Sequence, residues 1–255
     1  MENFIFQNPT KLIFGKGMIA QLSKEIPEGK RVMLTFGGGS VKKNGVYEQV
    51  KEALKGFDVV EFWGIEANPK IETLRKAIQL GKEKKVDFLL AVGGGSVIDG
   101  TKLISAGLMY EGDAWELVLK GSFRHTVPLG AVLTLPATGS EMNSGAVISR
   151  SETAEKYPFY SNYPVFSVLD PTVTFSLPVY QVACGIADTF VHVMEQYMTV
   201  PGQSRLMDRW AEGILHSLIE IAPEIIQHQD NYDKMADFML CATMGLNGFI
   251  ALGVR

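Results

Sequence analysis

The sequence predicts an α/β domain with a parallel sheet, followed by an all-α region. Two observations support this fold class. Up to about residue 177, short apolar runs alternate with amphipathic helical periods, which is typical of strands and helices in a parallel sheet. From Pro178 onward, long helical periods replace the glycine turns and β-branched runs. We therefore expect one domain over residues 1–177 and an all-helical region over residues 178–255.

The elements follow in order along the chain. Apolar, β-branched runs predict strands at Leu12–Phe14, Arg31–Phe36, Val59–Phe62, Phe88–Val92, Val127–Pro136, Ala146–Ile148 and Val165–Leu169. Helical spacing predicts one helix that ends near Pro27, helices at Val46–Leu54 and Ile71–Lys85, and one that includes Val97, Thr101 and Ile104. The second region predicts helices at Gln181–Tyr197, Ser204–Ile226 and Tyr232–Leu252, with breaks at Pro201-Gly202 and His228–Asn231.

The stretch VDFLLAVGGGSVIDGTK, residues 86–102, is the centre of this plan. Its strand ends in a glycine turn, Gly93-Gly94-Gly95-Ser96, from which a helix starts. Glycines let a backbone approach an anion closely, and the amides that open a helix carry partial positive charge, so this turn suits a diphosphate. The alternative is an ordinary tight turn between strand and helix. A second GGGS turn, Gly37–Ser40, lies at the same carboxyl edge of the sheet, which predicts a Rossmann-like dinucleotide-binding domain.

Two better-known phosphate loops do not fit this stretch. The dinucleotide fingerprint G-x-G-x-x-G requires glycine where this chain has Ile98. The P-loop requires Lys before Ser or Thr, but here Thr101 precedes Lys102, and on a helix this swap turns the lysine by about 100°. A different family of glycine loops is therefore needed.

Composition restricts the class of partner. The net charge of −4 without a basic cluster argues against nucleic acid and anionic membranes. The first ten residues lack a signal-peptide pattern, and no apolar run reaches the roughly 18 residues of a membrane span, so we expect a cytoplasmic protein with a small-molecule partner. Cys184 and Cys241 form no C-x-x-C pair, and we expect both to be small apolar fillers.

Asp188 and His192 stand four residues apart in a predicted helix, so both side chains leave the same helix face. A carboxylate and an imidazole at this spacing can hold one divalent cation, although a local hydrogen bond or cap is the alternative. Ile186, Phe190 and Val191 are apolar, which predicts a mostly buried helix in which an unpartnered carboxylate is costly.

Two other patterns are interpreted as chance. Tyr47-x-x-x-Lys51 has the spacing of short-chain dehydrogenases, but it directly follows the first glycine turn, too early to meet a substrate in that fold. Ser140 lacks a G-x-S-x-G elbow, and the histidines have no triad-like context, which argues against a serine hydrolase.

Several motifs occur along the chain in a specific order. They are Gly37-Gly38-Gly39-Ser40, Asn68-Pro69, Gly93-Gly94-Gly95-Ser96-x-x-Asp99-x-x-Lys102, Leu135-Pro136-Ala137-Thr138-Gly139-Ser140-Glu141, Leu169-Asp170-Pro171 and Gly185-x-x-Asp188-x-x-x-His192. Together they resemble the iron-dependent (group III) alcohol dehydrogenases, with the butanol dehydrogenase and NADPH-dependent aldehyde reductase branch the most similar. The resemblance extends from Phe4 to the end of the sequence.

The resemblance implies a metal-dependent oxidoreductase that interconverts primary alcohols and aldehydes, such as butanol and butyraldehyde, by hydride transfer to or from NAD(P)(H). It also implies a homodimer. Two alternatives stay open: a polyol (glycerol-type) dehydrogenase of the same superfamily, and a catalytically silent dinucleotide-binding fragment.

The resemblance also implies the site residues. The implied cofactor contacts are Gly37, Gly38, Ser40, Asn68, Gly93, Gly94, Gly95, Ser96, Asp99, Thr138, Ser140, Lys156 and Leu169. Asp188 and His192 match metal ligands of the family and are the expected catalytic residues. A shell of carboxylate and imidazole groups suits Fe²⁺ or Zn²⁺.

The first glycine turn predicts NADP(H) over NAD(H). NAD-specific sites usually place an acidic residue at the end of the strand that reaches the ribose, where it repels a 2′-phosphate. This chain has Gly39 and Ser40 there, followed by Lys42 and Lys43. The alternative is that both lysines only belong to a solvated helix start.

The end of the sequence suggests an incomplete helical domain. The family carries two further histidines that complete the metal shell, but no histidine follows His228, and the sequence ends at Arg255 soon after Leu246-Asn247-Gly248. We therefore expect a truncated chain, which binds NADP(H) at best, holds metal weakly and associates through uncovered apolar helices. A partner chain or rearranged helices that supply the missing groups are the alternative.

Overall fold

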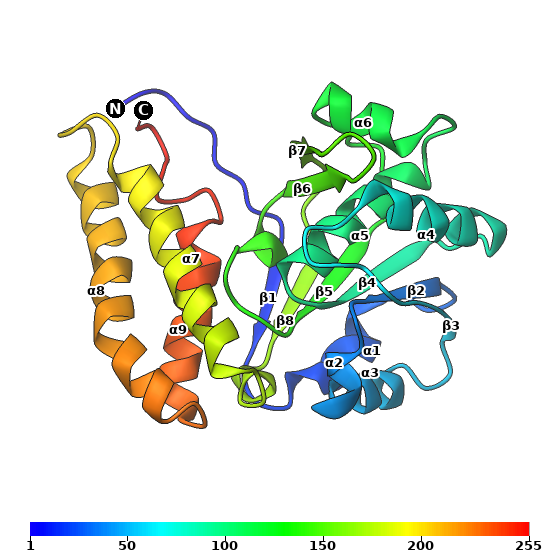
Figure 1. Cartoon of the computed structure of the whole chain (residues 1–255), viewed down its shortest axis with the longest axis horizontal. Coiled ribbons are helices and arrows are strands. Elements are labelled where there is room, and N and C mark those ends of the chain that lie inside the picture. Colours follow the sequence, from blue (N-terminus) through cyan, green and yellow to red (C-terminus); the bar gives the residue numbers. More distant parts are fainter. Residues whose placement is uncertain (255) are drawn as a thin grey trace.

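Six parallel strands form the central sheet of the computed structural model, which describes residues 1–254 (Figure 1). Their order across the sheet is β1-β8-β5-β4-β2-β3, and an antiparallel pair, β6-β7, forms a separate two-stranded sheet. The strands are β1 (Lys11–Phe14), β2 (Arg31–Phe36), β3 (Asp58–Phe62), β4 (Phe88–Gly93), β5 (Leu129–Leu133), β6 (Gly145–Arg150), β7 (Glu155–Tyr160) and β8 (Phe166–Leu169).

Helices cover this sheet and then form a bundle beside it (Figure 1). The α-helices are α1 (Leu22–Glu25), α2 (Ser40–Lys43), α3 (Val46–Ala53), α4 (Ile71–Glu83), α5 (Gly95–Gly107), α6 (Ala114–Lys120), α7 (Val179–Tyr197), α8 (Arg205–Gln227) and α9 (Tyr232–Gly245). Short 3₁₀ helices are η1 (Met18–Gln21), η2 (Ser140–Met142) and η3 (Pro171–Thr174). The predicted fold class, a parallel α/β sheet followed by helices, is confirmed.

The strand β4 is buried along its entire length, as its unbroken apolar run predicts. Leu89 and Ala91 face a core shared with α4, α5 and α6. Phe88, Leu90 and Val92 face the opposite core, which η1, α1 and α3 cover. The alternation of side chains along one strand therefore requires helices on both faces of the sheet.

The two glycine turns lie where the helical connections after β2 and β4 go to opposite faces of the sheet. The helix α3, which follows β2, lies on one face of the sheet, whereas α5, which follows β4, lies on the other. Because β2 and β4 are neighbours, their carboxyl ends form a topological switch point, the usual ligand site of such sheets. The fold thus brings the Gly37–Ser40 and Gly93–Ser96 turns together at one edge.

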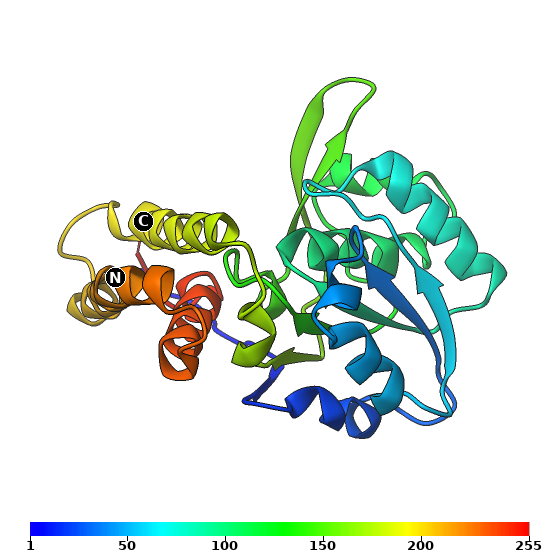
Figure 2. The same ribbon diagram turned by 60° about the horizontal axis from the view of Figure 1, so that its bottom comes forward.

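The β6-β7 hairpin projects from the body of the protein (Figure 2). The sequence predicted part of β6 but neither β7 nor α6. Pro158 interrupts the local strand signal of β7, which pairs with β6 through contacts such as Ile148 opposite Tyr157 and buries Phe159. This strand therefore depends on its partner more than on its own sequence.

The predicted helix Tyr232–Leu252 is wrong at its end, because α9 stops at Gly245. Leu246 leaves helical geometry with φ −141°, and Gly248 adopts φ +87°, which favours glycine. The chain then turns back onto the N-terminal segment, where Phe6 and Phe249 pack edge to face and Glu2 N donates to Gly253 O. These contacts are long-range and leave no periodic signal in the sequence.

The helix α7 is not mostly buried, contrary to prediction. Its outer face exposes Val179, Tyr180 and Val191, and an apolar groove runs between α7 and α8. Cys184 also lies on this exposed face, so the expectation of a buried filler is wrong for it, whereas Cys241 is partly buried. Over residues 1–254, no helix combines the length and apolarity required to cross a bilayer.

A close backbone contact seats α7 on the loop that follows β5. A Cβ atom added at Gly185 would lie only 2.5 Å from Pro136 O. Thr189, one turn further along α7, donates its hydroxyl to Ala137 O at 3.1 Å. Glycine at position 185 therefore sets the distance between the helix and the sheet.

We predict that Gly185→Ala destabilises the protein by about 1–3 kcal/mol, because the added methyl group forces α7 away from Pro136. Gly213→Ala is the matched control: it lies inside α8 with no atom within 4 Å of its added Cβ, and alanine favours the helix. Urea unfolding monitored by circular dichroism measures both. Equal stability of the Gly185 variant and the wild type would contradict the close contact.

Candidate functional site

The second glycine turn opens α5. The first hydrogen bonds of this helix run from Val97 N and Ile98 N to Gly94 O, so the amides of Gly95 and Ser96 precede the bonded helix. Such amides can bind an anion. A Cβ added at Gly95 would lie 2.4 Å from Thr138 Oγ1, so glycine is required for the close approach of the two segments.

In the first glycine turn, Gly39 adopts φ +99° and is the N-cap of α2, which starts at Ser40. A Cβ added at Gly38 or Gly39 would meet no atom within 4 Å, which leaves room for a ligand against the backbone. Lys42 Nζ lies 4.1 Å from the ring centroid of Trp63, and Trp63 stacks on Phe36. Lys42 is thus held at the carboxyl ends of β2 and β3.

Tyr47 and Lys51 both hydrogen-bond to Glu61, at 3.0 and 3.1 Å. This carboxylate also accepts from Trp63 Nε1 at 2.9 Å. The bonds from Trp63, Lys51 and Tyr47 hold the pKa of Glu61 below its ordinary value, although burial alone would raise it. The Tyr-x-x-x-Lys pattern therefore has a structural partner within the fold, in agreement with its interpretation as chance.

Two predicted contacts from distant parts of the sequence, Asn68 and Lys156, meet beside the second turn. Asn68, with φ +55°, donates its backbone N–H to Ser96 Oγ at 3.3 Å. Lys156 on β7 donates to Asn68 Oδ1 at 2.8 Å, so the hairpin reaches across to the turn. Leu169 is not brought to this surface, because its side chain is fully buried and its carbonyl accepts from Gly15 N.

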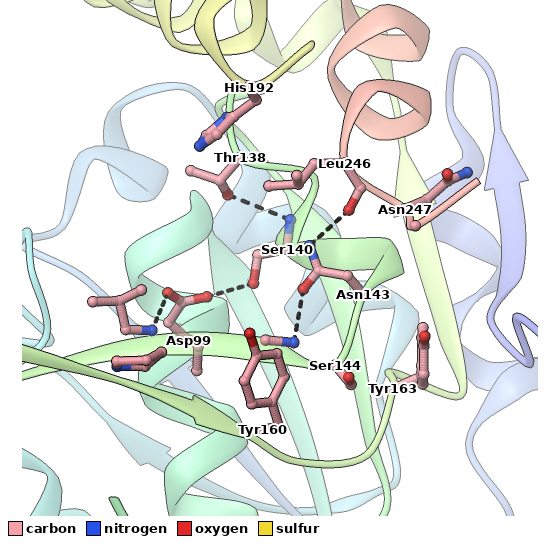
Figure 3. A pocket seen from close by; sticks show the side chains of 15 residues that line it. Asp99, Thr138, Ser140, Asn143, Ser144, Tyr160, Tyr163, His192, Leu246 and Asn247 are labelled. Atoms are coloured by element: carbon pink, nitrogen blue, oxygen red, sulfur yellow. Dashed lines mark hydrogen bonds between the residues drawn. The ribbon is translucent and has the colours of Figure 1, made fainter. Parts of the chain in front are cut away.

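A cavity of about 410 Å³ opens between the β6-β7 hairpin, the loop after β5, α7 and the segment after α9 (Figure 3). Asp99, Thr138, Ser140 and His192 all line this pocket, with His192 close to Thr138 (Figure 3). The fold therefore brings four of the predicted site residues, from both regions of the chain, around one cavity.

Asp188 and His192 share one face of α7, with 3.8 Å between Asp188 Oδ2 and His192 Nδ1. His192 Nδ1 is buried and has no hydrogen-bond partner, so its lone pair could bind a metal ion. A carboxylate and an imidazole are donors of the type that divalent cations bind, but this set consists of two side chains. Among residues 1–254, no group of three or more His, Cys, Asp and Glu side chains is placed to hold a metal.

Lys102 is a site-forming residue that the sequence analysis assigned no role. It is fully buried in α5. Its Nζ donates to Ser140 O, Ser140 Oγ, Asn143 Oδ1 and Gly145 O over 2.6–3.1 Å. The available signal was a lysine flanked by apolar residues three positions after Asp99, and this local pattern does not identify the partners of Nζ.

A hydroxyl links Lys102 to the pocket. Ser140 Oγ donates to Asp99 Oδ1 at 2.5 Å, and Val147 N donates to the other carboxylate oxygen at 2.9 Å (Figure 3). Glu141 is buried and accepts from Thr243 of α9 at 2.5 Å. Burial raises the pKa values of Asp99 and Glu141, whereas it lowers the pKa of Lys102 to about 8.

Comparison with known proteins gives one consistent family. The family model described as iron-containing alcohol dehydrogenase matches residues 9–171. The NADPH-dependent aldehyde reductase YqhD of Escherichia coli K12 is 54% identical over 260 residues, which include 100% of this chain and 67% of that protein. The crystal structure of Escherichia coli YqhD superposes with a TM-score of 0.96 at 53% identity, over 99% of this chain and 66% of that one.

A more distant structure supports the same result. The NADH-dependent butanol dehydrogenase A of Thermotoga maritima superposes with a TM-score of 0.95 at 41% identity, over 100% of this chain and 66% of that one. The chain thus spans about two thirds of the length of these relatives.

The burial of Lys102 predicts a specific pH dependence of stability. Below pH 8 the folded and unfolded states both hold the proton, so the cost of burying the ammonium is fully present. Between about pH 8 and 10.5 the folded state releases a proton that the unfolded state keeps. The free energy of unfolding should therefore rise by on the order of 1 kcal/mol per pH unit from this group, and Lys102→Met should lack the rise.

Urea unfolding of wild type and Lys102→Met, measured from about pH 7 to pH 10, gives the difference between the two pH profiles. Cys241, whose pKa burial raises to about 11, contributes equally to both proteins and cancels in the difference. Parallel profiles would contradict a Lys102 that titrates in this range.

Proposed function

Because the chain belongs to the iron-containing alcohol dehydrogenase family, we propose that it interconverts primary alcohols and aldehydes, such as butanol and butyraldehyde, with NAD(P)(H). One observation carries the proposal: a single pocket is lined by Thr138, which packs on the second glycine turn, and by His192 of α7. A cofactor bound at the turn and a carbonyl held near His192 would meet in this pocket.

The chain's own residues bind and orient the reactants in this proposal. The amides of Gly95 and Ser96 hold the diphosphate at the N-terminus of α5, which is a full helix of 13 residues. Asn68, Lys156, Thr138 and Asp99 border the path from this turn to the pocket. The aromatic and aliphatic wall, which includes Pro158 and Tyr160, limits the access of water to the reacting carbon.

Asp188 and His192 are the proposed metal ligands and catalytic residues. The buried, unpartnered Nδ1 of His192 supports this assignment. When bound, the nicotinamide supplies the hydride, and a divalent metal stabilises the charge that grows on the carbonyl oxygen. The donor types suit Fe²⁺ and Zn²⁺ alike.

We further propose a dinucleotide-binding domain over residues 1–177 and the first part of an all-helical metal-binding domain over residues 178–255. Support comes from the chain path: the last sheet-associated element, η3, ends at Thr174, and α7 starts at Val179. Two apolar clusters form the cores of the helical part. One includes Val182, Ile221 and Phe238, and the other includes Val193, Leu215 and Ile250.

A second candidate is a dinucleotide-binding protein without turnover. The observation that favours it is the donor set of two metal-binding side chains in the described part of the chain. Each missing ligand weakens both the affinity for the metal and its effect on a carbonyl.

Turnover assays with the purified protein separate these functions. Oxidation of NADPH by butyraldehyde supports the alcohol/aldehyde enzyme, whereas reduction of NAD⁺ by glycerol supports the polyol enzyme. Binding of NADPH without either reaction supports the silent binder. A protein that binds no nicotinamide nucleotide would contradict all three.

Preference for NADP(H) is proposed from the first glycine turn. Neither position 39 nor position 40 carries an acidic side chain, and the ammonium of Lys42 is held nearby above the ring of Trp63. The relatives include an NADPH-dependent and an NADH-dependent enzyme, so the choice rests on this chain's own residues.

We predict that Gly39→Asp weakens NADPH binding relative to Gly39→Asn. Two like charges about 4 Å apart repel by about 1–4 kcal/mol, which corresponds to roughly fivefold or more in Kd. Asparagine is the matched control because both variants carry the same strain at the φ of +99°. NADH affinity should be equal in the two variants, and fluorescence titration of both nucleotides measures this. Equal NADPH affinity in the two variants would contradict the preference.

The metal assignment predicts that His192→Ala lowers the metal content per chain while NADPH affinity stays nearly unchanged, because the glycine turns lie in the sheet region. Metal analysis after dialysis and fluorescence titration provide the two readouts. His216→Ala, on an exposed position of α8, is the control and should alter neither. Unchanged metal content in His192→Ala would reduce the pair to ordinary helix packing.

A further inference from the structure

Lys102 is fully buried, and the hydride-transfer chemistry proposed above does not use it. A buried ammonium is costly unless its N–H groups find acceptors. Here two backbone carbonyls and two side-chain oxygens of residues 140–145 surround Nζ. The loop between β5 and β6 is therefore folded around this one charge.

The first branch of this network reaches the pocket through Ser140. Its hydroxyl accepts a hydrogen bond from Lys102 at 2.9 Å and donates its single proton to Asp99 at 2.5 Å. Since Lys102 can only donate, it orients the hydroxyl toward the carboxylate. Asp99 and Ser140 both line the pocket.

The second branch reaches the segment after α9 through Asn143. Its Oδ1 accepts from Lys102 at 3.1 Å and from Gly145 N at 3.0 Å, which directs Nδ2 the other way. Nδ2 donates to Gly139 O at 2.9 Å and to Leu246 O at 3.0 Å. Leu246 follows α9 and lines the pocket (Figure 3).

We propose that Lys102 is a positioning residue that fixes two parts of the pocket lining for the nicotinamide half of the cofactor. It acts on the Asp99–Ser140 side through one branch and on the Leu246 side through the other. This inference rests on the proposed function, because it assigns the pocket to nicotinamide.

The same geometry separates the two halves of the cofactor. The first glycine turn follows β2, whereas the loop that surrounds Lys102 follows β5, and the two strands lie on opposite sides of β4. Loss of the ammonium should therefore disturb the pocket while it leaves the adenosine end in place.

The test compares two probes, NADPH and adenosine 2′,5′-bisphosphate, which contains only the adenosine half. Lys102→Met keeps most of the length of the side chain without the ammonium. We expect its NADPH affinity to fall by about tenfold and its bisphosphate affinity to stay equal to that of the wild type. Isothermal titration calorimetry on the folded proteins measures both.

Ser105→Ala is the matched control. Ser105 lies one turn further along α5, is fully buried and donates to Val127 O. Its loss should lower stability without changing the ratio of the two affinities. The control thus separates a general destabilisation of α5 from a specific effect on the pocket.

Equal weakening of both probes in Lys102→Met, or no weakening of either, would overturn the inference. If this variant does not fold, Asn143→Ala replaces it, since it breaks the branch to Leu246 and leaves the other acceptors of Lys102 intact. Selective loss of NADPH affinity in that variant supports the inference, and an unchanged ratio overturns it. A wild type that binds no nicotinamide nucleotide would overturn the proposed function and, with it, this inference.

Discussion

The burial of β4 on both faces is the constraint on which the rest of this structure depends. A strand with no solvated side requires helices on each face, and parallel neighbours require crossover connections. The crossovers after β2 and β4 go to opposite faces, so their carboxyl ends form a topological switch point. The glycine turns and the N-terminus of α5 lie at this switch point as a direct result.

Close packing around the loop after β5 joins the two parts of the protein. On one side, Thr138 packs so tightly on Gly95 that any side chain there would collide with it. On the other side, Pro136 contacts Gly185 of α7. Two glycines in different parts of the chain thus serve steric needs that differ from backbone flexibility, and both bring the pocket walls together.

Polar groups inside this packed region form hydrogen bonds with one another. Lys102, Ser140 and Asn143 satisfy one another, so the loop has little freedom to move independently of α5 and of the segment after α9. By contrast, the outer face of α7 and the groove beside α8 expose apolar side chains such as Val191 and Ile219. Rigid order on the sheet side therefore coexists with an exposed apolar surface on the helical side.

The sequence by itself determined the elements whose signals are local. The strands β2 and β4, the glycine turns and most helices followed from periodicity within a few residues, and Asp188 and His192 share a face because helix geometry requires it. Tertiary structure decided the strand β7, the end of α9, the exposure of Cys184 and the partners of Lys102. Each of these depends on contacts between segments distant in sequence. Such contacts contribute to the stability of the fold only once the sheet and the helices have packed together.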